Sequence, residues 1–414
     1  MRVLVICPHF APDVAPTGEV MDSIVAGLAD LGHRIHVVTA LPWYRHHAID
    51  SGWEGRVVRR ERTPWGVVTR LHPFPSDKGN LLARAASFLG FTILALVAAL
   101  RRAPGEGRPD VVLTMSPPLV LGVSGWLAAR RWRVPLVFNI QDVFPDVAVE
   151  VGAITSRPVI AAATWLERFL YRRSAGVTVL SEDLRRNLAA KLAGHRPERV
   201  EIIPNFVDTE RIVPSDRRTP YRDEFGLGDR TVVMYAGNLG FSQSVELLVD
   251  AAAHFAEVPE VVFVVNGAGS AKDSLVARGA GLSNLIWVGY QPRERLGEVL
   301  ASADIHCVLL KPGLAASSVP SKTYAILAAG RPCVASIDVG SEVDRMLTAA
   351  QCGIAVPPDD LAAFTTALSD LLDNPAGRSE MGAAARTWVE SWLSPAAVAE
   401  AYESLFERVL SARR

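Results

Sequence analysis

Runs of apolar residues alternate with amphipathic stretches from the first residues of the chain. Residues 2–7 are mostly apolar, and a loop rich in proline and glycine follows at 8–18. From about Glu19 to Leu31 apolar side chains recur at helical spacing, and Gly32 marks the end of that stretch. A second strand is predicted at 35–39. The first 40 residues therefore predict a β-α-β unit.

The same alternation runs along the chain and restarts once. Strands are predicted at 111–114, 136–140, 176–180 and 200–203, and again at 231–237, 261–265, 285–288, 305–309 and 332–336. A polar, irregular stretch from about 208 to 230 separates the two series. Strands that alternate with helices predict doubly wound parallel sheets. We therefore expect an α/β protein with two Rossmann-like domains, residues 1–207 and 208–394.

Charge is distributed unevenly between the two halves. The chain has 414 residues, 49% of them apolar, and a formal net charge of −1. Residues 1–204 hold 25 Lys and Arg against 18 Asp and Glu, a net charge of +7, and residues 205–414 hold 18 against 26, a net charge of −8. The basic half predicts contact with an anionic membrane surface or a phosphate-bearing acceptor. Nucleic acid is a less favoured partner, because the basic residues are not interleaved with aromatic ones.

The cysteines and the start of the chain bear on its location. Cys7, Cys307, Cys333 and Cys352 lie far apart and form no C-x-x-C motif, which argues against a metal or redox centre. A reduced, cytoplasmic protein is expected. Met1 leads directly into the first strand, so no signal peptide is expected.

One apolar segment raises the question of membrane contact. Residues 85–100 carry no charge over 16 positions, and arginines lie on both sides. A spanning helix needs about 20 apolar residues, so a span is the least favoured interpretation. A helix packed on the sheet and a helix lying in the membrane interface both remain open. The neighbouring arginines favour anionic lipid, and a peripheral position on the inner face of the cell membrane is expected.

Several short motifs occur in an order that resembles a known family. They are Gly-His at 32–33, Q-D-V-F-P-D at 141–146, P-N-F-V-D at 204–208, G-N-L-G at 237–240 and P-S-K-T-Y-A-I-L-A-A-G-R-P at 320–332. Nearly the whole chain resembles the retaining glycosyltransferases of the GT-B fold, family GT4. The Gln-Asp pair at 141–142 is similar to that of the WcaI/WbuB-like subgroup, which builds bacterial surface polysaccharides.

The resemblance implies a fold and a reaction. Two Rossmann-like domains would face a cleft, with a final helix in residues 395–414 crossing back to the first domain. The second domain would bind a nucleotide-diphosphate sugar with UDP or GDP, and the first a lipid-linked sugar or glycan acceptor. The sugar would be transferred with retention of configuration, and no metal or other cofactor is expected.

The donor site implied by the resemblance departs from the family pattern. Neutral Asn238 and Gln243 stand where many relatives carry Arg and Lys, and Ser317 and Ala325 replace two glutamates. We expect Ser321 to cap a helix at 323–329 whose amino end, with Lys322, holds the diphosphate. The alternative is an ordinary capped helix with its lysine in water. The expected donor-binding residues are Gly18, Gly237, Asn238, Gln243, Gly267, Gly269, Gly289, Tyr290, Ser318, Val319, Ser321, Lys322, Thr323 and Glu342.

The first domain would carry the acceptor and most of the chemistry. Asp142 could hold the acceptor hydroxyl and take up its proton, although a turn or helix-cap aspartate is the simpler interpretation. Gln141 stands where most relatives have His, and together with Asp142 and Lys322 it completes the expected catalytic set. His9 and Glu19 are further acceptor candidates, although a lone loop histidine is more often structural.

Other functions are less well supported by the sequence. The missing cations and glutamates would suit a non-catalytic relative that binds nucleotides or glycans. A sugar-nucleotide 2-epimerase would need a cluster of carboxylates and a histidine that the motifs do not supply. A dehydrogenase would show G-x-G-x-x-G after the first strand, and residues 8–18 do not fit that pattern.

Overall fold

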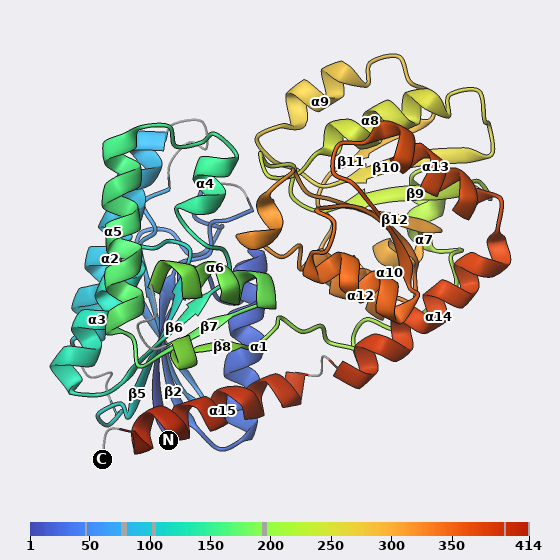
Figure 1. Ribbon diagram of the computed structural model, residues 1–414. Coiled ribbons are helices and arrows are strands. Elements are labelled where there is room, and N and C mark those ends of the chain that lie inside the picture. The colour runs from blue at the N-terminus through green and yellow to red at the C-terminus, as the bar shows by residue number, and fades with distance from the viewer. Residues whose placement is uncertain (46–47, 76–80, 102–104, 193–196, 393–394, 413–414) are drawn as a thin grey trace. The chain divides into compact units, whose positions relative to one another are not determined.

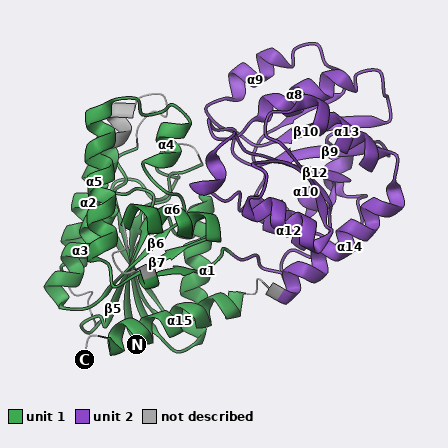
Figure 2. Ribbon diagram, in the orientation of Figure 1, with its two compact units in different colours: residues 1–205, 395–414 green, residues 206–394 purple. Residues whose placement is uncertain are grey.

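A computed structural model describes residues 1–45, 48–75, 81–101, 105–192, 197–392 and 395–412. The chain forms two compact units (Figure 2). Unit 1 comprises residues 1–205 and 395–414, and unit 2 comprises residues 206–394. Each unit is built on its own sheet with helices on both faces (Figure 1). Two doubly wound α/β units confirm the predicted fold class.

Unit 1 holds an eight-stranded sheet in the order β3-β4-β2-β1-β5-β6-β7-β8. Its strands are β1 (Arg2–Ile6), β2 (Arg34–Ala40), β3 (Val58–Thr63), β4 (Gly66–Leu71), β5 (Val111–Ser116), β6 (Leu136–Ile140), β7 (Gly176–Val179) and β8 (Val200–Ile202). All pairings are parallel except that of β3 with β4. The β3–β4 hairpin was not predicted, because β3 is an edge strand whose charged residues are half exposed.

The helices of unit 1 cover both faces of this sheet. They are α1 (Pro16–Asp30), α2 (Leu81–Ala99), α3 (Leu121–Trp132), α4 (Asp146–Glu150), α5 (Arg157–Arg173), α6 (Glu182–Leu192) and α15 (Pro395–Ser411), with a 3-10 turn at Pro197–Arg199. Helix α3 packs between α2 and α5, whereas α1 packs against α15 (Figure 1). A Cβ atom on Gly27 of α1 would lie 2.7 Å from the Cβ of Ala399, so α15 lies directly on α1.

Helix α2 answers the question raised by the apolar segment. Phe91, Ala95 and Ala99 are buried in the core of unit 1. Leu89, Ile93 and Val97 lie on the opposite face and are 54%, 53% and 42% exposed. The helix therefore packs on the sheet and also presents an apolar stripe to solvent. None of the helices in the described residues combines the length and apolar character needed to cross a bilayer.

Unit 2 holds a six-stranded, all-parallel sheet in the order β11-β10-β9-β12-β13-β14. Its strands are β9 (Thr231–Ala236), β10 (Val261–Asn266), β11 (Leu285–Val288), β12 (Ile305–Leu309), β13 (Cys333–Ser336) and β14 (Gly353–Val356). Its helices are α7 (Pro220–Glu224), α8 (Val245–His254), α9 (Lys272–Arg278), α10 (Leu296–Ala301), α11 (Lys322–Ala328), α12 (Glu342–Ala350), α13 (Leu361–Leu372) and α14 (Pro375–Trp392), with 3-10 turns at Arg293–Arg295 and Leu314–Ala316.

Two local predictions were wrong. Helix α1 begins at Pro16 rather than Glu19, because proline suits the first helical position and the carbonyl of Ala15 accepts the N–H groups of Gly18 and Glu19. Gly18 therefore lies in the first turn of α1 and not in the loop. The stretch expected to be irregular at 208–230 contains α7, whose cap is the side chain of Thr219.

Candidate active site

Three loops meet at the carboxyl ends of β10, β9 and β12, which are neighbours in the sheet of unit 2 (Figure 1). The N–H of Leu239 donates to the carbonyl of Ala268 at 2.9 Å, and the N–H of Ala271 donates to that of Leu239 at 3.0 Å. The N–H of Lys311 donates to the carbonyl of Ser242 at 3.0 Å. These bonds join the loops after β9, β10 and β12 into one surface at the edge where ligands bind in parallel α/β sheets.

The glycines of this surface are explained by close backbone packing. A Cβ atom on Gly267 would lie 1.9 Å from the carbonyl oxygen of Gly237, and one on Gly269 would lie 2.2 Å from that of Leu239. Gly237 itself has a φ of +151°, a conformation that other residues rarely adopt. Glycine at these three expected donor-binding positions lets the two loops touch along their backbones.

Lys322 places an unpaired ammonium group beneath this surface. Its Nζ lies 3.7 Å from the centre of the Tyr235 ring and is buried, yet it has no hydrogen-bond partner among the residues that the structure describes. A Cβ atom on Gly237 would come within 3.0 Å of it. Burial lowers the pKa of Lys322 to about 7. A buried donor without an acceptor is costly, so the position favours an anionic ligand that would satisfy it.

Helix α11, whose first residue is Lys322, does not begin as predicted. Ser321 has helical backbone angles, φ −56° and ψ −23°, and its side chain caps nothing. The N–H and the hydroxyl of Thr323 both donate to the carbonyl of Pro320, at 3.1 and 2.8 Å. Helix α11 therefore continues from a turn at Pro320 and has only seven residues. The cap prediction was wrong, since the Ser321 side chain makes no cap hydrogen bond within the described residues.

The neutral residues at the expected cation positions serve partly to shape the loop after β9. The Oε1 atom of Gln243 accepts the N–H of Gly240 at 3.1 Å, and its Nε2 donates to the hydroxyl of Ser242 at 2.7 Å. The hydroxyl of Tyr235 donates to the carbonyl of Asn238 at 2.7 Å. These bonds hold the loop over Lys322.

The remaining donor candidates differ in how far they are exposed. Gly289 and Tyr290 follow β11 and are exposed, Ser318 is half-buried, and Val319 is buried. Glu342 begins α12, where its carboxylate lies 2.8 Å from Arg345. Sequence reasoning overlooked Lys311, which lies two residues after β12 and whose backbone N–H bonds to the loop after β9. Its position after a buried strand was the signal that could have revealed it.

In unit 1, a chain of side-chain amides lies at the carboxyl end of β6. The Nδ2 of Asn205 donates to Oε1 of Gln141 at 2.9 Å, and Nε2 of Gln141 donates to Oδ1 of Asn139 at 2.9 Å. Asn139 in turn donates to the hydroxyl of Tyr402 in α15 at 2.8 Å. Gln141 is 4% exposed, so these contacts give it a positioning role. Asp142, the next residue, is half-buried at the same strand end.

The loop after β1 orders His9 more strongly than the sequence indicated. Its Nδ1 lies 2.6 Å from Oδ2 of Asp13, and its ring stacks on Trp43 with centroids 5.7 Å apart. Gly18 packs beneath it, since a Cβ there would lie 2.9 Å from the Cβ of His9. Glu19 is half-buried in the same helical turn. Sequence reasoning missed Asp13, although its spacing of four residues from His9 was visible.

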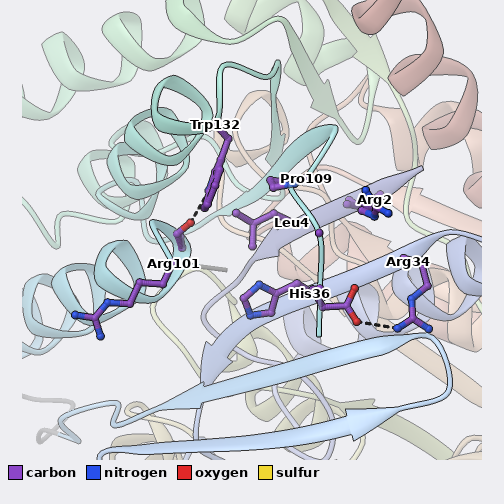
Figure 3. Close-up of a pocket in the computed structure, with 11 residues that line it drawn as sticks. Arg2, Leu4, Arg34, His36, Arg101, Pro109 and Trp132 are labelled. Carbon is purple, nitrogen blue, oxygen red and sulfur yellow. Dashed lines mark hydrogen bonds and ion pairs between the residues drawn. The ribbon is translucent and has the colours of Figure 1, made fainter. Parts of the chain in front are cut away.

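Two further features bear on where ligands bind. A small hollow in unit 1 is lined by Arg2, Arg34, His36 and Trp132, among other residues (Figure 3). It lies at the amino ends of β1 and β2, opposite to the loop of His9, and Arg34 there is already paired with Glu106. Among the described residues, no three His, Cys, Asp or Glu side chains gather closely enough to hold a metal ion.

Comparison with known proteins covers both units. Residues 17–205 match a family model described as glycosyl transferase 4-like domain, and residues 230–374 match one described as glycosyl transferases group 1. The colanic acid biosynthesis glycosyl transferase WcaI of Escherichia coli K12 is 26% identical over 383 residues, 90% of this chain and 92% of that protein. The glycosyltransferase WbjE of Pseudomonas aeruginosa is 25% identical over 307 residues, 72% and 75% of the two chains.

Solved structures show the same fold. Sucrose-phosphate synthase from Thermosynechococcus elongatus superposes with a TM-score of 0.77 at 17% identity over the whole of both chains. HepE from Anabaena in complex with UDP-glucose gives 0.71 at 14% identity, again over the whole of both chains. WaaG, a glycosyltransferase involved in lipopolysaccharide biosynthesis, gives 0.64 at 16% identity over 97% and 99% of the chains. With glycosyltransferase family models matching both of its units, the chain belongs to the GT-B glycosyltransferases of family GT4.

Proposed function

We propose that this glycosyltransferase moves a sugar from a UDP- or GDP-sugar to a lipid-linked sugar or glycan during assembly of a surface polysaccharide. The observation that carries the donor assignment is the buried, unpaired ammonium of Lys322 at the carboxyl edge of the unit 2 sheet. WcaI is described as a glycosyl transferase of colanic acid biosynthesis and WaaG as one involved in lipopolysaccharide biosynthesis, and HepE was solved with UDP-glucose. These relatives support the substrate class.

In the proposed donor complex, positive charge comes from lysines in place of the family's usual pair. Lys322 would bind the diphosphate from below, and Lys311 would approach it from the loop after β12. Asn238 and the N–H groups of the loop after β9 would add neutral donors. Glu342 is the candidate for the ribose hydroxyls. This arrangement needs no metal ion.

The proposed transfer retains the configuration of the donor sugar. The acceptor hydroxyl, held by Asp142, would attack from the face that the nucleoside diphosphate leaves. Lys322 would stabilise the charge that develops on the departing diphosphate. Gln141 would act through Asn205 and Asn139, by keeping the strand end beside Asp142 in place.

The proposed location is the cytoplasmic face of the cell membrane, held peripherally. Helix α2 supports this, because Leu89, Ile93 and Val97 form an exposed apolar stripe. Helix α3 packs between α2 and α5, and Trp165 on α5 is 66% exposed. An exposed apolar patch of this kind usually marks a surface that contacts a membrane or another protein.

Arginines accompany the aromatic residues of this face. The guanidinium of Arg130 lies 5.6 Å from the ring centre of Trp126, and that of Arg173 lies 5.5 Å from the ring centre of Phe169. Apolar and aromatic side chains mixed with cations suit the headgroup region of an anionic bilayer.

Thermal stabilisation by a panel of UDP- and GDP-sugars, without added metal, tests the donor assignment. A ligand at about 100 times its Kd adds roughly 2.7 kcal/mol, which is readily measured as a shift in Tm. A shift in the wild type that disappears in Lys322→Met supports the site. The absence of any shift would overturn the donor assignment. Nucleotide-sugar binding without sugar transfer to any acceptor would instead indicate a relative that binds nucleotides and does not catalyse transfer.

A further inference from the structure

The loop between β1 and α1 holds a histidine–aspartate pair in a fixed geometry. Asp13 is 3% exposed, and both of its carboxylate oxygens are used. Oδ2 lies 2.6 Å from Nδ1 of His9, and Oδ1 accepts the backbone N–H of Tyr44 at 3.0 Å. The His9 ring also lies edge-on to Tyr44, with ring centres 5.3 Å apart. The imidazole is therefore oriented by a carboxylate and two flanking aromatic rings.

A buried arginine from β4 fixes the loop itself. Arg70 donates to the carbonyl oxygens of Phe10 and Ala11, the two residues after His9. It also pairs with Glu61 at 3.1 Å, and its guanidinium lies 5.1 Å from the ring centre of Trp53. The loop thus rests on the β3–β4 hairpin. Because this buried cation is paired and hydrogen-bonded, it can hold the loop and the backbone beside His9 in one conformation.

The pair leaves one ring nitrogen of His9 available for chemistry. Because an ionised carboxylate only accepts hydrogen bonds, the proton of neutral His9 lies on Nδ1 and the lone pair on Nε2. Nε2 makes no hydrogen bond within the described residues, and the side chain keeps 11% of its surface exposed. By contrast, Nε2 of His36 is bonded to Thr69 and Nε2 of His306 to Leu300. The arrangement of His9 matches that of a general base oriented by a carboxylate.

We propose that His9, oriented by Asp13, takes the proton from the acceptor hydroxyl during glycosyl transfer. This rests on the proposed function, and it moves the role of base from Asp142 to His9. Strands β1 and β6 are separated only by β5, so their ends lie about 10 Å apart, within the span of a glycan acceptor. Asp142 is then left to hold the acceptor.

The proposed step breaks two bonds and forms two. The O–H bond of the acceptor breaks, and its proton passes to Nε2 of His9. The acceptor oxygen forms a bond to the anomeric carbon of the donor sugar. The bond from that carbon to the diphosphate oxygen breaks, and its electron pair leaves with the nucleoside diphosphate. Asp13 stabilises the imidazolium, which later returns its proton to water.

The first test reads the tautomer directly and needs no substrate. The full chain, labelled with ¹⁵N-histidine, is examined by NMR, and the His9 signals are identified by their loss in His9→Gln. We expect an Nδ1–H tautomer for His9 in the wild type and its loss in Asp13→Asn. An Nε2–H tautomer in the wild type would overturn the proposal, whatever the enzyme's activity.

The second test measures release of UDP or GDP from the panel of nucleotide sugars, with water standing in for the acceptor. We expect His9→Gln to lower kcat by about 10²–10⁴-fold with UDP affinity unchanged. Asp13→Asn should also lower kcat with UDP affinity unchanged, because the imidazole loses the carboxylate that orients it. His254→Gln, at an exposed position, is the matched control.

The two proposals fail in different ways. If His9→Gln and Asp13→Asn keep wild-type rates while Lys322→Met abolishes nucleotide binding, the donor site stands and the base is not His9. If the wild type binds no nucleotide, the donor assignment fails, and the tautomer still decides whether the His9 pair exists as described. Tm values of each variant identify any that fail to fold, and Asp13→Asn then replaces His9→Gln.

Discussion

Replacing Lys322 with methionine should stabilise the empty protein and weaken nucleotide binding. The pKa of Lys322 falls from an ordinary 10.5 to about 7 on folding. At 1.36 kcal/mol per pKa unit, a shift of 3.5 units corresponds to roughly 5 kcal/mol against the charged form. Contact with the Tyr235 ring offsets about 0.5–2 kcal/mol of what methionine would gain. We expect Lys322→Met to raise the free energy of unfolding by about 3 kcal/mol.

Binding should respond in the opposite direction. A hydrogen bond to a charged group contributes about 1.5–3 kcal/mol, so loss of the ammonium should weaken UDP binding roughly 10- to 150-fold. At about 2–4 °C per kcal/mol for a unit of this size, the same variant should melt roughly 6–12 °C higher. A residue that destabilises the fold while it strengthens ligand binding is expected at a functional site.

The same lysine makes the free energy of unfolding and the affinity for UDP depend on pH. Between pH 7 and 10.5 the unfolded chain binds a proton at Lys322 that the folded protein has released, so stability should rise with pH over that window. Below pH 7 both states are protonated and this contribution is constant. A bound diphosphate favours the charged form, so UDP binding above pH 7 should take up a proton and weaken by up to about tenfold per pH unit.

Titration calorimetry with UDP at pH 8, in phosphate and in Tris buffers, measures this proton uptake directly. The two buffers have different ionisation enthalpies, so an uptake near one proton appears as a difference in the observed binding enthalpy. Lys322→Met should abolish that difference. Equal enthalpies in both buffers for the wild type, or a variant that melts lower and binds UDP normally, would refute the reasoning.

Three further predictions follow from the packing. Gly267→Ala should destabilise unit 2 by about 3 kcal/mol or more, since its Cβ would lie 1.9 Å from the carbonyl oxygen of Gly237. Gly297→Ala should cost far less, because its Cβ would meet only the carbonyl oxygen of Arg211, 3.9 Å away, and urea unfolding compares the two variants. Ile93→Glu should leave Tm within a few degrees and reduce the fraction of protein that sediments with phosphatidylglycerol vesicles. Neutral phosphatidylcholine vesicles are the reference, and unchanged sedimentation would exclude the α2 stripe as the membrane contact. Tyr402→Phe should lower the free energy of unfolding by about 1 kcal/mol, because the Asn139 amide loses the hydroxyl to which it donates. Denaturant unfolding measures this change, and an unchanged free energy would mean that the bond contributes nothing.

Much of the fold could be predicted because its strands are buried on both faces. The limits of β6, β11 and β12 agree with the predicted 136–140, 285–288 and 305–309, where mostly apolar runs end at turns. Strand β3 was missed because half-exposed arginines and glutamate give it no apolar face to detect. Its position is set by pairing with β4, which sequence periodicity does not reveal.

The candidate site was less accessible to sequence reasoning. Lys322 could be singled out because its segment follows a buried strand, but its burial against Tyr235 depends on a contact between residues 87 positions apart in the sequence. Ser321 has the residue type of a cap, yet Pro320 draws the backbone into a turn that removes the need for one. His9 and Asp13 are four residues apart in a loop, where no regular geometry predicts that they touch.

The position of α15 has a consequence for how the protein is made. This helix supplies Tyr402 and covers α1, yet it follows the whole of unit 2 in the chain. At about 5–20 residues per second, a ribosome needs on the order of 10–40 s to synthesise residues 206–394. Throughout that interval the nascent unit 1 has an uncovered apolar face and an Asn139 amide without its tyrosine. Unit 2, encoded in one continuous stretch, can complete its own core first, so the amino-terminal half of this enzyme is the half that finishes folding last.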